Sequence, residues 1–346
     1  MAGLAAAAYF TFWPVPIDPV AWRPSPNPGM TGVFAANDRL QGIRQLPVPG
    51  PGPEDVASGP DGWLYTGLQD GRIVRLRPDG GPAEIFVSTG GRPLGLQFDR
   101  SGNLIVADAF RGLLSVSPSR QVRVLSNRAG YERFLFTNDL DIATDGGIWF
   151  TDASRRFDQH HWILDFWEGM ATGRLIRYDP AASRADVRLD GLRFANGVAL
   201  GPDDAFVLMS ETVSARITRF WLKGPKAGRT EPFIQNLPAY PDNISYNGHG
   251  IFWVALASPR VDALERLAPH PQMRKAVFRL PPALRDPQPQ KFGWVIGLDL
   301  NGKVVYNLQD PSRTYGPISS VNEISGQLYL GSIGMEAIGR FPAPAQ

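Results

Sequence analysis

The sequence has no cysteine, few histidines and no excess of charge of either sign, and each shortage removes a class of function. Without cysteine there is no disulfide framework, no thiolate metal site and no cysteine nucleophile. The 35 Lys and Arg residues nearly balance the 33 Asp and Glu residues, and no basic run carries interleaved aromatics, so we expect no nucleic-acid partner. Any chemistry must therefore use oxygen ligands, hydroxyls, carboxylates or the four histidines.

Several catalytic motifs are missing as well. The chain contains no GxSxG elbow, no phosphate-binding loop and no HExxH helix, so a serine hydrolase, a nucleotide hydrolase and a zinc protease all lack support. What the chain does have is apolar residues, which make up 43% of its 346 positions, while 20% are charged. This composition can bury a large core and excludes wholesale disorder.

The N-terminal residues 1–13 are apolar, and no charge precedes Asp18. Prolines 14 and 16 limit any helix to about thirteen residues, whereas a bilayer span needs about 20. We interpret this segment as an apolar arm or anchor remnant that seeks a membrane, with a hydrophobic strap packed on the domain as the alternative. Residues 14–52 are rich in Pro and Gly and predict an extended lead-in. A membrane-associated or extracytoplasmic location is favoured.

From residue 53 to residue 346 the sequence returns to one pattern of short β-rich runs separated by Asp, Asn and Gly turns. The openings of five units are spaced by 40, 44, 58 and 46 residues, at Glu54, Leu94, Asn138, Asn196 and Asp242. A fifth unit pairs DNISYNGHGIFWVALA with KAVFRL, and a sixth pairs GWVIGLDLNGKVVYNL with GQLYLGSIGMEAIGRF. Six such units predict an all-β fold, a six-bladed β-propeller in one domain, with two packed sandwiches as the alternative.

Two insertions break the β pattern and predict short helices. Residues 159–170 place apolar side chains at helical spacing, and residues 260–275 form a weaker helical stretch around RVDALERL. The apolar positions of the first insertion are Trp162, Ile163, Phe166, Trp167 and Met170. Since long loops of a propeller gather on one rim, we expect both over the mouth of the central channel, as a lid or membrane-contacting surface or as a cap packed on its neighbours.

The openings of the units carry polar residues where inner strands would line a buried channel. These residues are Glu54, Asn138, Asn196, Asp242 and Asn243. Burying one unpaired amide or carboxylate is costly, so convergent polar groups imply a shared partner. Two carboxylates and three amides suit a hard divalent cation such as Ca²⁺, and the two carboxylates balance its charge. Taken singly, each residue is more typical of a turn cap; the matching repeat positions favour the metal.

Two further carboxylates, Asp55 and Asp139, directly follow Glu54 and Asn138. Because neighbours in a strand point to opposite faces, this pair would converge on a second position. A buried, purely structural ion is one interpretation, and two solvated or turn-capping aspartates are the other.

The sequences of the units resemble those of a known family. The phrases PEDVA, RPLGLQF, FTNDLDI, FTDAS, FANGVAL, SET, YPDNIS and QLYLGS occur in this order. They resemble the strictosidine-synthase-like branch of the calcium-dependent six-bladed propellers, which includes the adipocyte plasma-membrane-associated proteins; paraoxonases and gluconolactonases are more distant. The resemblance implies a channel Ca²⁺ on the five residues above, and a second structural Ca²⁺ at Asp55, Asp139 and the main-chain carbonyl near Leu96.

Departures from the family pattern bear on the activity. Leu94 and Ala109 stand where paraoxonases carry a histidine pair, and Ile318 to Val321 replace the region of the catalytic glutamate of the plant condensing enzyme, with Glu323 shifted along. The four histidines of this chain fall in the first insertion or in loops and do not replace that base; they are His160, His161, His249 and His270.

These observations favour a Ca²⁺-dependent hydrolase of esters or lactones, similar to an arylesterase or lactonase. Asp242 or Glu54 would accept a proton from water. Asp152 is a candidate supporting residue or a blade-stabilising one. One alternative is a binding or scaffold propeller whose metal only braces the channel. A further alternative is a strictosidine-synthase-type enzyme that forms C–C bonds.

Overall fold

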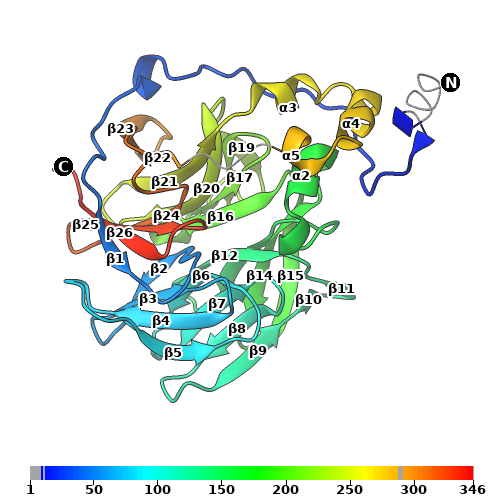
Figure 1. The fold of residues 1–346 in the computed structure, drawn as a ribbon. Coiled ribbons are helices and arrows are strands. Elements are labelled where there is room, and N and C mark those ends of the chain that lie inside the picture. The colour runs from blue at the N-terminus through cyan, green and yellow to red at the C-terminus, as the bar shows by residue number, and fades with distance from the viewer. Residues whose placement is uncertain (1–8, 11, 287–290, 346) are drawn as a thin grey trace.

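The computed structural model describes residues 9–10, 12–286 and 291–345. In this part of the chain, six four-stranded antiparallel sheets are arranged around a central axis (Figure 1). The innermost strands touch in a closed ring, in the order β2, β6, β12, β16, β20, β24 and back to β2. The six-bladed propeller expected from the repeats is therefore confirmed.

Five blades follow the chain from the inside outwards. The first contains β2 (Val56–Ser58), β3 (Leu64–Gly67), β4 (Arg72–Leu76) and β5 (Glu84–Ser88). The second contains β6 (Pro93–Phe98), β7 (Leu104–Asp108), β8 (Gly112–Val116) and β9 (Val122–Ser126). The third contains β12 (Thr137–Ile142), β13 (Ile148–Asp152), β14 (Gly173–Asp179) and β15 (Arg184–Leu192). The hairpin of β10 (Arg128–Ala129) and β11 (Glu132–Arg133) precedes the third blade.

The fourth blade contains β16 (Ala195–Leu200), β17 (Phe206–Glu211), β18 (Arg216–Trp221) and β19 (Thr230–Ile234), with the turn η3 (Pro202–Asp204). The fifth contains β20 (Ala239–Tyr246), β21 (Phe252–Pro259), β22 (Gly293–Leu298) and β23 (Val304–Asp310). KAVFRL is therefore not the strand that was expected in the fifth unit. Its residues lie in and after a helix that Pro271 starts, and the strands GWVIGL and VVYNLQD complete this blade instead.

The sixth blade joins the two ends of the chain. It contains β24 (Ile318–Ile324), β25 (Gln327–Ser332), β26 (Ala337–Pro342) and, outermost, β1 (Arg44–Pro47). In this pairing Leu46 lies opposite Ile338. The lead-in therefore contributes a strand, and the sequence-based boundary at residue 53 leaves it out. Before this strand the lead-in holds the short turn η1 (Gly32–Phe34), and most of the apolar arm lies outside the described residues.

A buried acid ends the second strand of the second, third and fourth blades and fixes the loop beside it. Asp152 accepts hydrogen bonds from the N–H groups of Leu135 and Phe136 and pairs with Arg174 at 2.6 Å. Asp108 and Glu211 hold similar positions, opposite the first residues of their inner strands. Asp152 is thus engaged in holding its blade together.

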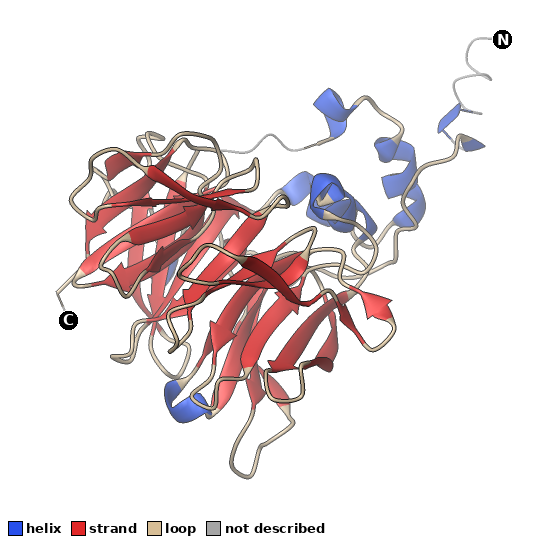
Figure 2. Ribbon diagram, turned by 90° about the horizontal axis from the view of Figure 1, so that it is seen from below, coloured by secondary structure: helices blue, strands red, loops and turns tan. Residues whose placement is uncertain are grey.

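Both insertions form helices on the side where the inner strands begin. After β13 come η2 (Gln159–His161) and α2 (Ile163–Glu168), and after β21 come α3 (Asp262–Arg266), α4 (Pro271–Phe278) and α5 (Pro282–Arg285). Figure 2 shows α2 to α5 gathered on one side of the sheets, and we call them the lid. None of the helices in the described ranges has both the length and the apolar character needed to cross a bilayer.

Candidate metal centre

The inner strands are irregular at the positions of the predicted ligands. The pairing with the second strand shifts between Thr137 and Leu140, between Ala195 and Val198, and between Pro241 and Ile244. Such bulges re-aim side chains and interrupt the strict alternation of faces. This explains how the consecutive residues Asp242 and Asn243 can both serve one channel.

Close packing of the blades holds the bulged segments together at the axis. A Cβ added to Gly197 would lie 2.5 Å from the Cα of Asn243, so only glycine fits where the fourth and fifth blades meet. Asn243 Nδ2 donates to Glu54 Oε1 at 2.9 Å, which links the first and fifth blades. A hydrogen bond from Asn196 reaches Asp242. Asn138 holds the equivalent position on β12, beside β16.

Four of the five predicted ligands carry a buried oxygen that has no hydrogen-bond partner in the structure. These atoms are Glu54 Oε2, Asn138 Oδ1, Asn196 Oδ1 and Asn243 Oδ1, on side chains 3 to 4% exposed. Unpartnered buried acceptors are rare in proteins, and a shared cation would satisfy several of them. No group of three acidic, histidine or cysteine residues suited to a metal occurs among the described residues, and this donor set combines two carboxylates with three amides. The residues fit a hard cation.

We call the five predicted ligands, Glu54, Asn138, Asn196, Asp242 and Asn243, the ring. Electrostatics at this ring also favour a positive partner. Burial raises the pKa of Glu54 well above its usual value, and the nearby Asp242 raises it further. Burial likewise raises the pKa of Asp242 to about 7, although the hydrogen bond from Asn196 opposes the shift. Two carboxylates that resist ionisation together will bind either protons or a cation.

A set of supporting residues at the ring was not identified from the sequence. Thr212 Oγ1 accepts a hydrogen bond from Asn196 Nδ2 and donates one to the carbonyl of Pro241, the residue before Asp242. Ser319 Oγ donates to the carbonyl of Glu54 at 2.7 Å. Arg92 is buried beside Glu54 and donates to the carbonyl of Gly52. The SET phrase that contains Thr212 was a signal of the repeat, but its contacts depend on the folded bulge.

The second predicted site is arranged differently. Asp55 Oδ2 accepts from the Leu96 N–H at 3.0 Å, and Oδ1 accepts from Asn322 Nδ2 at 2.8 Å. Asp139 accepts from the N–H groups of Leu140 and Val198. Burial raises the pKa of both carboxyls, and each stands near the other. All four carboxylate oxygens thus have N–H partners from the protein. The second ion stays a prediction without the signal seen at the ring.

An apolar cluster lies between the ring and the lid. It contains Leu94, Ala109, Phe136, Ala153, Phe194 and Val213, with Trp22 and Phe166 packed against it. Phe136 and Phe194 each lie two residues before a predicted ligand. Leu94 and Ala109 stand at the places of the paraoxonase histidine pair. Both therefore belong to an apolar wall of the channel. All four histidines of this chain are exposed.

Similarity to known proteins agrees with this architecture. A family model described as "Strictosidine synthase" matches residues 138–225, and one described as "Strictosidine synthase-like, N-terminal" matches residues 32–76. The human adipocyte plasma membrane-associated protein is 35% identical over 347 residues, covering 92% of this chain and 82% of that protein. The chain belongs to the strictosidine synthase-like family. Another member, STRICTOSIDINE SYNTHASE-LIKE 13 of Arabidopsis thaliana, is 36% identical and covers 81% of this chain and 75% of its own.

Solved structures show that the fold of this family member is widely shared. A gluconolactonase from Xanthomonas campestris superposes with a TM-score of 0.65 at 20% identity, over 95% of this chain and 97% of that one. A luciferin-regenerating enzyme superposes with a TM-score of 0.59 at 14% identity, over 86% and 95%. At such identities the likeness concerns the fold alone.

Proposed function

We propose that this strictosidine synthase-like protein is a Ca²⁺-dependent hydrolase of esters or lactones. The four unpartnered oxygens of the ring are the observation that carries the proposal. Glu54, Asn138, Asn196, Asp242 and Asn243 would hold the ion. When bound, Ca²⁺ would supply a positive charge that polarises a substrate carbonyl.

The carboxylates of the ring are the candidates for proton transfer. Asn243 engages only Oε1 of Glu54, which leaves Oε2 able to accept a proton from water. Asp242 is the other acceptor, and Thr212 fixes the backbone in front of it. No histidine competes for this role, since all four are exposed. Reaction and metal binding would thus share the same carboxylates.

The apolar cluster above the ring favours substrates with apolar acyl or aryl groups. Phe136, Phe166 and Phe194 pack edge to face or tilted there, with ring centroids 5.5 to 5.7 Å apart. The lid would contribute this wall. Phe12 and Trp13 of the arm are 80% and 59% exposed, and Arg279, just after α4, donates to the carbonyl of Trp13. We propose that arm and lid contact a membrane surface, which liposome flotation of a Phe12→Ser, Trp13→Ser variant tests.

Exchanging an acid for an amide within the ring tests whether the site catalyses. Asp242→Asn keeps an oxygen ligand but removes a proton acceptor and one charge, so at saturating Ca²⁺ the turnover of aryl esters and lactones should fall about 10²–10⁴-fold. Glu54→Gln is the parallel variant, because it removes the charge of Glu54 without shortening the side chain. Asn196→Asp adds charge, so it should tighten Ca²⁺ binding and lower turnover only moderately.

The same series distinguishes a binding propeller from an enzyme. If every ligand variant loses little activity and added Ca²⁺ restores it, or if the wild-type protein hydrolyses no member of an ester and lactone panel, the ion only braces the channel. A condensing enzyme lacks support here, because Ile318 to Val321 offer no acid and Glu323 is bonded to Trp253 Nε1 and Asn247 Nδ2.

A further inference from the structure

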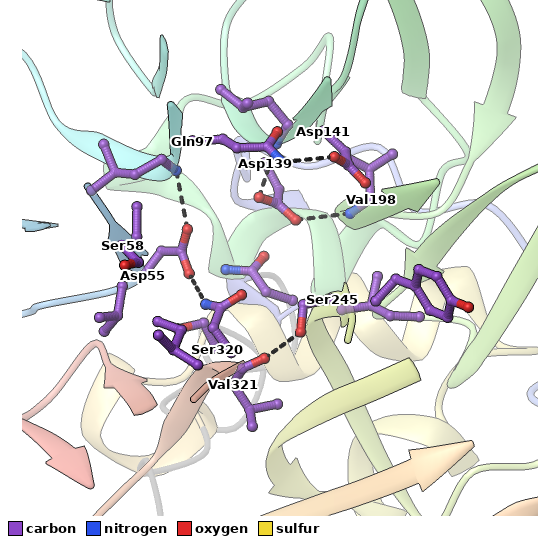
Figure 3. A pocket seen from close by; sticks show the side chains of 18 of the residues that line it. Asp55, Ser58, Gln97, Asp139, Asp141, Val198, Ser245, Ser320 and Val321 are labelled. Carbon is purple, nitrogen blue, oxygen red and sulfur yellow. Dashed lines mark hydrogen bonds between the residues drawn. The ribbon is translucent and has the colours of Figure 1, made fainter. Parts of the chain in front are cut away.

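A polar cavity of about 260 Å³ occupies the channel on the side away from the lid. It is lined by the later residues of the inner strands, from Asp55 to Ser58 in the first blade and from Ser320 to Ile324 in the sixth. Figure 3 shows Asp55 and Asp139 facing each other across it, with Asp141 and Gln97 beside them. Its outer rim is open to solvent, because Ser58 is exposed and Glu323 partly so.

The lining of this cavity is acidic. Four carboxylates line it, namely Asp55, Asp139, Asp141 and Glu323, and its lining contains no lysine, arginine or histidine. Asn243, a member of the ring, also lines the cavity, and it is 4% exposed with an unpartnered Oδ1. The cavity therefore extends from solvent to a proposed Ca²⁺ ligand.

The opposite approach to the ring is closed to a hydrated ion. The apolar cluster and the lid cover it, and the cavity beneath the lid, between Trp22, Phe166 and Tyr240, measures only about 10 Å³. Moving a charged ion through such a wall would strip its water without replacing it by oxygen ligands. An acidic, water-accessible channel instead attracts cations and keeps oxygen atoms around them.

We propose that this cavity is the path by which hydrated divalent cations enter and leave the ring, on the face opposite the lid. The inference rests on the proposed metal site. Asp141 and Glu323 would attract the ion at the outer part, and the hydroxyls and amides of the wall would accompany it to Asn243. The cation would thus avoid the apolar end of the channel that the lid covers.

A bulky residue at the rim tests this path, because an obstruction on a route slows both directions without changing the equilibrium. Ser58→Trp should lower the Ca²⁺ release rate into a fluorescent chelator, followed by stopped flow, by about tenfold. The Kd from equilibrium titration should stay within about twofold. Ser101→Trp, on an exposed turn outside the cavity, is the matched control and should leave both rates unchanged.

A charge variant gives an independent reading. Asp141→Asn combined with Glu323→Gln keeps the shape of the outer cavity and should slow Ca²⁺ association several-fold, with a weaker dependence on salt. Unchanged rates in both Ser58→Trp and the double variant would overturn the path. If the wild-type chain binds no Ca²⁺ by titration, the proposed metal site itself is wrong, and this result is distinct from a bound ion with unchanged kinetics.

Discussion

Buried carboxyls favour a bound proton or a cation, and Glu54 and Asp242 are two such groups. With no cation, burial favours the protonated form of both carboxyls and raises the pKa of Asp242 to about 7. A cation at the ring competes with these protons. Ion affinity and proton affinity at the ring are therefore linked, and both act on the stability of the fold.

This linkage predicts that chelation is more damaging at high pH. Because the folded-state pKa of Asp242 is raised to about 7, the ion-free protein keeps the stability of its protonated carboxyl at low pH and loses it as the pH rises through about 7. The Tm difference between Ca²⁺-loaded and chelated protein should thus be larger at about pH 8 than at about pH 5.5. Scanning calorimetry measures it, with Asp242→Asn as the control that flattens the dependence. Equal differences at both pH values would contradict the linkage.

The five ring residues could be predicted because they recur at matching positions of the repeat. Thr212 and Ser319 could not, since a lone hydroxyl in a sequence carries no sign of the bulge that it will support. Nor could the sequence show that Asp55 would accept the Leu96 N–H, because that contact depends on the twist between two blades.

Among the elements, α2 shows what helical spacing can and cannot predict. The pattern correctly placed a helix in residues 159–170, but not the environment of each side chain. Trp167 is buried and donates to Asp286, while Trp162 is 37% exposed. Arg274, from α4, donates to the carbonyls of Trp167 and Glu168, so the two insertions form one connected lid. Most of the apolar stripe therefore packs on neighbouring elements.

One acid within this lid helix predicts a pH effect on stability. Asp165 is 3% exposed, accepts from Ser154 Oγ at 2.9 Å, and burial raises its pKa to about 8. Its protonated form is favoured in the fold, so stability falls as the pH rises from the unfolded pKa of about 4 to the folded pKa of about 8. Asp165→Asn should match the wild-type Tm near pH 3.5 and exceed it near pH 8. The exposed Asp190→Asn is the control, and a gain at both pH values would indicate a cause other than ionisation.

At the scale of the whole molecule, the repeat predicted the number of blades but not how the propeller closes. The closing strand, RQLP, is four residues long, ends in proline and lies in a segment whose composition is typical of a loop. Only its partner reveals it as a strand, and that partner lies at the far end of the chain. KAVFRL shows the opposite error, since an apolar run suited to a strand became a helix.

The closing strand should contribute measurably to stability. Leu46 is 2% exposed and packs with Ile338 and Tyr329 in the core between the first and sixth blades. Leu46→Ala should destabilise the fold by about 2–5 kcal/mol, the usual cost of such a cavity. Denaturant unfolding measures this loss. Gln45→Ala, an exposed neighbour on the same strand, should cost much less. If Leu46→Ala costs as little as Gln45→Ala, β1 is only loosely attached.

The closure also sets the timing of folding during synthesis. β1 leaves the ribosome early, but its partner β26 follows about 290 residues later. At about 5–20 residues per second, the first strand waits roughly 15–60 s for its sheet. Through that interval the nascent chain carries an unpaired strand and an open stack of blades, both prone to association with other chains. The yield of soluble protein in a host cell should therefore rise with chaperone capacity and with slower initiation, which spaces nascent chains apart.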